Sequence, residues 1–572
     1  MQVRFHGKLT RGWVLGPTDD LPPRVLKVHK VVSPVRFFDE RLLELFRWMS
    51  ERYIAPLATV IGRSFPPRVA SEEHSVRGGG GGADAPLASP FPTPLRIDPP
   101  AFGPASAAVR VDRAFYRNGS ALFDAIRSSG AGLFRVRPAP EHEQLLAVDA
   151  VQACLDAGRR AIVIVGEAEP LPATAAHLAE TFGDRVALFV GGDKRERYRT
   201  WLEIQAGRYD VVVGTRPAVF APLGSLGLIW LSRESHALHR EERSPYFHVR
   251  DVAAKRAEIE DAVFVMSALC HSSEAAVMPA TDVEPATRAW PPVEVVKPGP
   301  EGRAPRLVAA LKESSRAFLF EPLRGYGVAR VCKSCGRPAA CAECGGALRV
   351  EQGRIRCVVC EAPGRCAECG STHFGIARGG AERVEEWLGR LVDVPVRRDD
   401  HPEPRAGVTV GGAESVKEID PPGLDLVGIL DADLAARRPG LSALEHALAV
   451  WMEAAGWARP NGRVIVQTRA PSDAALQSLV QGAPARHHRA ERRRREAAGF
   501  PPGFPVFRMF GGRDLRKRLD ETAPHHVLET SLGDETVCLL TIRPDALPEF
   551  GRTVRALAER GVVTRVEAEP HL

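Results

Sequence analysis

The chain has 572 residues, of which 44% are hydrophobic, and a formal net charge of +6 at pH 7. This length is enough for three or four globular domains. No apolar run approaches the roughly 18 residues of a membrane-spanning helix, and the N-terminus lacks a signal-peptide core, so we expect a cytoplasmic protein. The mildly basic charge permits nucleic-acid binding without requiring it.

Residues 1–70 are predicted to form a small module. Short apolar runs at 3–5, 12–15 and 25–28 favour strands. Asp39 is placed to cap a helix whose apolar residues recur at helical spacing, and these are expected to form a core. They are Leu42, Leu45, Phe46, Met49 and Tyr53.

The next segment, 71–108, is predicted to be a linker, because its five successive glycines and many prolines cannot bury enough apolar surface to fold. From about residue 109, buried-strand runs alternate with helical segments, which is typical of a parallel, doubly wound sheet. The alternation falls in two blocks, 109–298 and 299–485, and a small α/β tail follows at 486–572. The predicted strands are 161–165, 186–190, 211–213, 226–231, 262–266, 317–320, 408–410, 424–430 and 464–467.

Eight cysteines form four CxxC pairs inside the segment 330–371, which interrupts the second block. The pairs are Cys332/Cys335, Cys341/Cys344, Cys357/Cys360 and Cys366/Cys369. Two CxxC pairs complete one tetrahedral Cys₄ zinc site, so the eight thiolates predict two closed, structural sites. Neither site leaves an open position for catalysis.

A predicted hairpin favours one pairing of these ligands. The alternating runs 347–350 and 354–356 flank a turn that contains Gly353. The hairpin would bring Cys341/Cys344 to Cys357/Cys360 and leave the two outer pairs to meet each other. Sequential pairing is the alternative for the geometry, and iron is the alternative for the metal; disulfides are disfavoured in a cytosolic chain.

Two tandem α/β lobes, a Cys₈ insert and a small N-terminal module together resemble the PriA family of primosomal replication restart proteins. The resemblance runs from about residue 3 to the C-terminus, and the Cys₈ region is its most specific part. The other matching segments are Val213–Pro217, Phe220–Leu223, Phe247–Asp251, Cys369–His373 and Ile429–Asp433.

This resemblance implies an α/β fold with two RecA-like (helicase-type) lobes, a two-zinc insert, a small β-rich 3′-DNA-binding domain and a small C-terminal α/β domain. The N-terminal domain is expected to be partial, because the family's first strands have no counterpart before Met1. The family's zinc sites are nested, with one site made by the outer pairs (zinc 1) and the other by the inner pairs (zinc 2). The implied partners are replication forks, branched and single-stranded DNA, primosome proteins and the loading machinery of the replicative helicase. A nucleoid-associated location without membrane contact is implied as well.

The elements that handle ATP in that family are missing. No GxxxxGK[ST] motif occurs, and its expected place, 133–143, has two prolines and no glycine. The acidic motif is replaced by Ser232-Arg233-Glu234-Ser235 and the arginine-rich motif by Gly456-Trp457-Ala458-Arg459-Pro460. The GSAT-like motif has become Ser267-Ala268-Leu269-Cys270. The chain therefore resembles degenerate, actinobacterial-type members that lack helicase and ATPase motifs, and we expect no catalytic residue and no ATP binding.

The leading hypothesis is a non-enzymatic factor that binds stalled or abandoned forks, promotes primosome assembly and reloads the replicative helicase. The alternatives are a primosome scaffold without DNA affinity and a residual ATP-dependent 3′–5′ DNA helicase. Arg216 and the run Arg492–Arg495 are candidate phosphate contacts. A surface ion pair and a solvated helix face are their respective alternatives.

Overall fold

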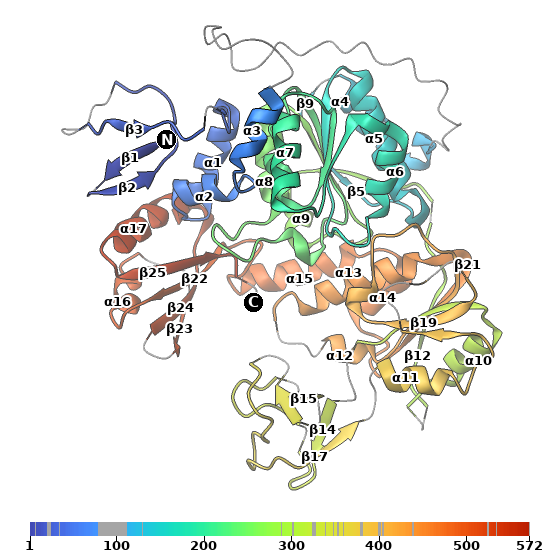
Figure 1. Cartoon of the computed structure of the whole chain (residues 1–572). Coiled ribbons are helices and arrows are strands. Elements are labelled where there is room, and N and C mark those ends of the chain that lie inside the picture. The colour runs from blue at the N-terminus through green and yellow to red at the C-terminus, as the bar shows by residue number, and fades with distance from the viewer. Residues whose placement is uncertain are drawn as a thin grey trace.

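The computed structural model contains, in the part of the chain that it describes, five sheets and the helices that cover them (Figure 1). It describes residues 1–572 apart from 6, 20–24, 34, 78–110, 129, 288, 300–301, 323–327, 338, 347, 352–353, 358–359, 378–380, 399–401, 403–404, 437–439, 523–525, 533–534 and 571–572. Most of the predicted linker therefore lies outside the described residues.

The N-terminal unit is a three-stranded antiparallel sheet followed by helices. Asp39 accepts a hydrogen bond from the Leu42 backbone N–H at 2.8 Å, so it caps the first helix as predicted. The five predicted core side chains of this helix are buried, in a core shared with the first lobe and the C-terminal unit. The elements are β1 (Gln2–Phe5), β2 (Lys8–Arg11), β3 (Val28–Lys30), α1 (Glu40–Arg52), α2 (Leu57–Arg63) and α3 (Ala70–Arg77).

Two predicted strands of this unit are displaced. Gly7, at φ +77°, closes a tight hairpin after β1, so the second strand occupies residues 8–11 and not 12–15. Trp13 leaves the sheet instead, and its ring centroid lies 5.4 Å from that of Phe37. β3 begins at Val28, where the predicted strand ends.

The predicted linker also begins too early. Residues 71–77 belong to α3, and the Glu72 side chain of this helix is only 1% exposed. It forms ion pairs with Arg195 and Arg199 of the first lobe. These pairs hold a helix where composition alone predicted a linker.

Lobe 1 is an eight-stranded sheet with the order β4-β11-β5-β10-β9-β6-β8-β7. All neighbouring strands are parallel except β4 and β11. The five strands predicted for this block are present, and helices cover both faces of the sheet (Figure 1). The elements are β4 (Tyr116–Arg117), α4 (Gly119–Arg127), β5 (Gly132–Val136), α5 (Glu143–Asp156), β6 (Arg160–Ile164), α6 (Ala173–Phe182), β7 (Val186–Phe189), α7 (Lys194–Gln205), β8 (Val211–Gly214), β9 (Leu226–Leu231), α8 (Val249–Glu260), β10 (Val263–Ser267), α9 (Ser273–Val277) and β11 (Thr281–Pro285).

Lobe 2 is a six-stranded, all-parallel sheet with the order β12-β21-β20-β13-β19-β18. Its first strand lies at 293–296, so it begins before the predicted boundary at 299. Helix α15 packs on both α14 and α9, so residues 485–497 join the lobes and not the C-terminal tail. The elements are β12 (Val293–Val296), α10 (Pro305–Glu313), β13 (Arg316–Phe320), α11 (Ala381–Leu388), β18 (Val396–Arg397), β19 (Gly407–Gly411), β20 (Leu424–Ile429), α12 (Ala432–Ala436), α13 (Ala443–Gly456), β21 (Ala458–Gln467), α14 (Ala474–Gln481) and α15 (Ala485–Ala497).

The cysteine-rich insert leaves lobe 2 after β13 and forms its own antiparallel sheet, which projects away from both lobes in Figure 1. Its strands are β14 (Val328–Cys332), β15 (Leu348–Glu351), β16 (Arg354–Cys357) and β17 (Phe374–Ala377). The insert is therefore slightly longer at each end than the predicted 330–371.

The C-terminal unit is a four-stranded antiparallel sheet with two helices. It packs beside the N-terminal unit, where Arg52 of α1 forms an ion pair with Glu569 at 2.7 Å. Its elements are β22 (Val506–Gly511), α16 (Leu515–Asp520), β23 (His526–Leu532), β24 (Glu535–Thr541), α17 (Leu547–Glu559) and β25 (Val563–Ala568). No helix among the described residues is long and apolar enough to cross a membrane.

Candidate functional site

The eight cysteines come together in two groups of four. Within each group the Sγ atoms all lie within 4.8 Å of one another. One group is Cys332, Cys335, Cys366 and Cys369, and the other is Cys341, Cys344, Cys357 and Cys360. The structure thus has the nested grouping and not the sequential one.

The sheet of the insert explains the nesting. β15 and β16 form the predicted hairpin, with Leu348 opposite Cys357. β14 pairs with the distant strand β17, with Cys332 opposite Phe374, and this pairing closes the outer site. An isolated bridge between Cys341 and Cys366 holds the two sites side by side.

The distances between thiols fit tetrahedral zinc. The closest Sγ–Sγ distances are 3.6 Å for Cys332–Cys369, 3.7 Å for Cys335–Cys366, 3.6 Å for Cys341–Cys360 and 3.4 Å for Cys344–Cys357. A tetrahedron with Zn–S bonds of about 2.3 Å has ligand-to-ligand distances of about 3.8 Å. Four thiolates complete such a site, so each group suits a structural ion.

A backbone turn recurs after the second cysteine of each pair. Gly336, Gly345 and Gly370 occupy this position with φ between +69° and +72°. The fourth turn places Glu361 there with φ +58°. Since a left-handed conformation favours glycine, three turns are matched to their geometry and the fourth is strained.

The segment at the expected nucleotide position is filled by the other lobe. Ala139 is fully buried, and the next residue, Pro140, faces Gly456 of α13. A Cβ added to Gly456 would lie 3.3 Å from the Cβ of Pro140 and 3.0 Å from Leu269. Leu269 and Cys270, at the GSAT-like position of lobe 1, belong to the hydrophobic core of lobe 2. Lobe 2 therefore packs directly against the place where a phosphate-binding loop is expected.

The residues at the acidic-motif position make internal ion pairs. The Arg233 guanidinium lies 3.4 Å from Glu167 of lobe 1 and 3.4 Å from Glu453 of lobe 2. Glu234 is fully buried and bound by Arg250 at 3.0 Å and by the Ser272 hydroxyl at 2.7 Å. Burial opposes the charge of Glu234, but Arg250, His271 and the hydrogen bonds from Ser272 together outweigh burial, so the pKa of Glu234 is lowered. Both side chains are already engaged by protein groups.

Two residues at the arginine-rich-motif position, Trp457 and Arg459, are also engaged in contacts within the protein. Trp457, in the former arginine-rich motif, is buried with its ring centroid 5.0 Å from that of Phe318. Arg459 is held at the surface of lobe 2 by Asp425, at 3.1 Å. Neither arrangement presents an arginine to a phosphate group between the lobes.

A buried carboxyl cluster lies at the same junction. Glu143, at the start of α5, accepts hydrogen bonds from Ser232 at 3.4 Å and Ser267 at 3.3 Å. Burial, together with the nearby Glu453 and Glu418 carboxylates, raises the pKa of Glu143 to about 8. Glu143 is therefore mostly protonated at neutral pH.

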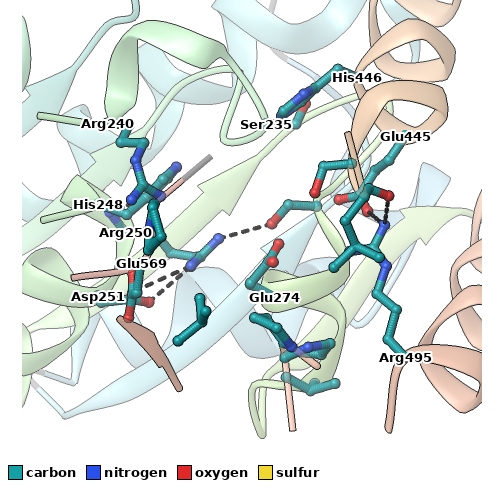
Figure 2. Close-up of a pocket in the computed structure, with 18 of the residues that line it drawn as sticks. Ser235, Arg240, His248, Arg250, Asp251, Glu274, Glu445, His446, Arg495 and Glu569 are labelled. Atoms are coloured by element: carbon teal, nitrogen blue, oxygen red, sulfur yellow. Dashed lines mark hydrogen bonds and ion pairs between the residues drawn. The ribbon is translucent and has the colours of Figure 1, made fainter. Parts of the chain in front are cut away.

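A cavity of about 400 Å³ lies beside the junction, where both lobes meet α1, α15 and the C-terminal unit. Figure 2 shows Arg250 paired with Asp251 on one side of the cavity and Arg495 paired with Glu445 on the other side. Arg240 donates to the Ala568 carbonyl at 3.0 Å. Within the described parts of the chain, no carboxylate lies within ion-pair distance of Arg240. The charges of Glu569 and Glu274, which also line the cavity, favour the cationic form of Arg240 without forming a direct ion pair, while burial lowers its pKa.

The candidate phosphate contacts are engaged in ion pairs. Arg216 lies 3.4 Å from Glu241. In the basic run on α15, Arg495 is buried against Glu445 at 2.9 Å, and Arg492 and Arg494 pair with glutamates of their own helix. The geometry favours the ion-pair alternative for Arg216. In the basic run, Arg493 is exposed, as a solvated helix face predicts, whereas Arg495 is buried.

Sequence reasoning missed most of the junction residues. Lys417 meets Glu167, and Glu453 meets Arg233, only because the two lobes stack. No spacing rule links residues that lie more than 200 positions apart in the chain. The one local signal was the arginine at a position where the resemblance predicts an acid. No feature of the sequence pointed to Arg240 in this way.

The fold and the site together define an α/β protein with two mainly parallel-sheet lobes and a two-centre Cys₈ insert. The family model described as "3'DNA-binding domain (3'BD)" of PriA matches residues 1–66. A "Probable replication restart protein PriA" of Mycobacterium tuberculosis (strain CDC 1551 / Oshkosh) is 28% identical over 97% of this chain and 89% of its own length. The "Replication restart protein PriA" of Treponema pallidum (strain Nichols) is 28% identical over 88% of this chain and 80% of its own length.

The chain is therefore similar to PriA proteins over most of its length. Among solved structures, the helicase Lhr of Mycobacterium smegmatis, bound to ssDNA and AMP-PNP, covers 76% of this chain and 59% of its own, with 13% identity and a TM-score of 0.36. A likeness at that level carries no argument about function.

Proposed function

We propose that this protein is a replication restart factor that binds stalled or abandoned forks without hydrolysing ATP. It promotes primosome assembly and reloading of the replicative helicase, as a cytoplasmic, nucleoid-associated protein. Similarity to PriA proteins over most of the chain and the match to a 3′-DNA-binding domain support the restart role and the DNA partner. Primosome proteins and the helicase-loading machinery are the proposed protein partners.

The main support for the proposal that ATP is not hydrolysed is the packing of Pro140 against Gly456. A phosphate-binding loop needs free backbone N–H groups, a lysine and space for a triphosphate. Here a proline occupies the loop position, and the facing helix leaves less than a methyl group of space. Neither alternative gains similar support, since a helicase needs this space and the 3′-DNA-binding match disfavours a scaffold without DNA affinity.

The two cysteine groups are proposed to hold one Zn²⁺ each, in a structural role. The ligands of zinc 1 are Cys332, Cys335, Cys366 and Cys369, and those of zinc 2 are Cys341, Cys344, Cys357 and Cys360. Bound zinc would neutralise the thiolates and fix the insert as a rigid module. This module projects from the lobes and is therefore available to DNA or to a partner protein.

The test is to titrate a fluorescent model fork with the purified full-length chain over a salt series, while following phosphate release in the same samples. Zinc content is measured by elemental analysis. We expect two zinc ions per chain, affinity that falls steeply with salt, and no phosphate release above background. Phosphate release stimulated by DNA would overturn the non-enzymatic role, and zinc-loaded protein without fork affinity would favour the scaffold alternative.

A further inference from the structure

The contact between the lobes is centred on Arg233, which stands at the acidic-motif position of lobe 1. Its side chain is 5% exposed and contacts acids of both lobes, Glu167 and Glu453, at 3.4 Å each. It also donates to the backbone carbonyl of Val416 in lobe 2, at 3.1 Å. One buried guanidinium therefore bridges the two lobes through both side chain and backbone.

The segment that follows β19 in lobe 2 also contacts lobe 1. The Lys417 ammonium lies 2.9 Å from Glu167, and the Glu418 backbone N–H donates to Glu167 at 3.0 Å. The Glu418 carbonyl accepts from the Ala173 N–H at 2.9 Å, and its carboxylate accepts from the Thr174 N–H at 3.3 Å. Because Pro172 gives α6 no side-chain cap, lobe 2 supplies the missing acceptors for this helix N-terminus.

A second set of contacts closes the junction farther along α13. Glu445 accepts from both the backbone N–H and the hydroxyl of Ser273, at 2.7 and 2.6 Å, and it binds Arg495 at 2.9 Å. Leu269 and Cys270 add apolar contact to the lobe 2 core. Separation of the two lobes would break all of these contacts together and expose the lobe 2 core to water.

The charges at this junction pair directly across the two lobes. In nucleotide-driven pairs of lobes, acids hold Mg²⁺ and an arginine reaches the phosphates during hydrolysis. Here Arg233 of lobe 1 pairs with Glu453 of lobe 2, and Lys417 of lobe 2 pairs with Glu167 of lobe 1. No nucleotide is needed to bring these opposite charges together.

We propose that Arg233 is an internal cation that holds the two lobes permanently closed, so that they act as one rigid body. This inference rests on the proposed function, because it assumes that ATP does not drive the lobes. It goes further by assigning Arg233 as the residue that replaces the nucleotide-dependent clamp. The relative orientation of the two lobes is then preformed and independent of any nucleotide.

The experiment measures the distance between the lobes in the full-length, zinc-loaded protein. Non-natural ketone side chains at Glu180 and Lys312, both exposed and in different lobes, carry the spin labels. Thiol labels are unsuitable because four of the metal-site cysteines are exposed. Pulsed electron spin resonance then gives the distance distribution with and without a non-hydrolysable ATP analogue or fork DNA.

For the wild type we expect one narrow distance that neither ligand changes. Arg233→Met should add a second, longer distance, and Glu453→Gln, which keeps the shape of the side chain, should add a smaller fraction of it. The matched control is Arg306→Met, because Arg306 is 69% exposed and its ion pair with Glu294 lies away from the junction. If Arg233→Met fails to fold, the distances measured in the wild type and in Glu453→Gln decide whether the rigid-body proposal holds.

A second distance in the wild type, or a shift on adding the nucleotide analogue, overturns the rigid-body proposal. So does a distribution that stays narrow in both junction variants. Phosphate release is followed in parallel to separate the two proposals. Hydrolysis by the wild type would overturn the proposed function, whereas lobes that move without hydrolysis would overturn only the role of Arg233.

Discussion

The metal module and the lobe junction both gather acidic groups that need a positive charge, but they obtain it differently. In the insert, the two zinc ions proposed above would neutralise the eight thiolates, and these ions come from outside the chain. At the junction, the cations Arg233, Lys417 and Arg495 are part of the chain. The difference teaches that metal removal should affect the insert as proposed, whereas substitution of charged residues and pH should affect the junction.

Loss of a zinc ligand should have the largest effect and should be confined to the insert. Replacing Cys357→Ser removes a buried ligand of zinc 2, and structural zinc contributes about 10–16 kcal/mol in small zinc domains. We expect zinc content to fall to one ion per chain, and the 328–377 segment to become sensitive to protease, while the melting of the lobes is unchanged. Cys538→Ser, a buried thiol outside the insert, is the control. Coupled unfolding of the lobes would break the comparison.

Breaking a built-in charge pair should affect the lobes and spare the metal. Arg495 and Glu445 are 2% and 4% exposed, so Arg495→Met leaves a buried carboxylate without its cation. Such an uncompensated charge destabilises by about 3–5 kcal/mol. We expect a lower melting temperature, with two zinc ions retained. The double variant with Glu445→Gln should recover much of the loss, and no recovery would show that the pair is not the cause.

These contrasts follow from what a sequence can encode locally. All eight metal ligands lie between Cys332 and Cys369, so the CxxC spacing and one hairpin predicted their grouping. Most buried strands were predicted as well, because apolar runs need no knowledge of their neighbours. The N-terminal hairpin was misplaced by about four residues, since the tight turn at Gly7 outweighed the apolar run near Trp13.

For the junction between the lobes, the sequence predicted only that the family's ATP-handling motifs are missing. Changes at four motif positions predicted a loss of phosphate chemistry, but not which contacts the residues there would make. Whether Arg233 is solvated or paired depends on Glu453, which is 220 positions away and on another lobe. Likewise, β12 and α15 were assigned to the wrong side of their boundaries, because strand pairing and helix packing decide those limits.

The junction, unlike the insert, should respond to pH through Glu143. Its pKa is raised from 4.5 to about 8 in the folded protein, so the stability it contributes is complete below about pH 4.5. This stability is lost as pH rises to 8, because the unfolded chain releases the proton first. Each pKa unit corresponds to about 1.4 kcal/mol, so Glu143→Gln should be more stable than the wild type at pH 8 by a few kcal/mol.

The measurement is thermal unfolding of both proteins at pH 5 and pH 8. Most of the advantage of Glu143→Gln should disappear at pH 5. Glu313→Gln is the control, because that carboxylate is 67% exposed. An equal shift at both pH values would mean that packing, and not the proton, causes the effect.

The cavity beside the junction should contribute to DNA affinity through Arg240. Since this cation lacks a carboxylate partner among the described residues, Arg240→Gln should weaken fork binding about tenfold at low salt. The slope of log affinity against log salt should fall by about one unit, as for the loss of one phosphate contact. Arg216→Gln, whose arginine is paired with Glu241, should change affinity much less. Equal losses in the two variants would argue for a general charge effect.

The smallest predicted effect returns to the insert and concerns its backbone. Glu361 holds the left-handed position that glycine occupies in the other three turns, so Glu361→Gly should relieve strain of about 1 kcal/mol. The side chain is 73% exposed, and its 3.9 Å contact with Arg349 adds little. In Glu361→Gly, we expect a chelator to remove zinc 2 about fivefold more slowly than in the wild type. In the reverse variant, Gly336→Ala, we expect it to remove zinc 1 faster. Because neither change touches a ligand or the lobes, opposite shifts would show that turn geometry tunes metal retention in the insert independently of the junction.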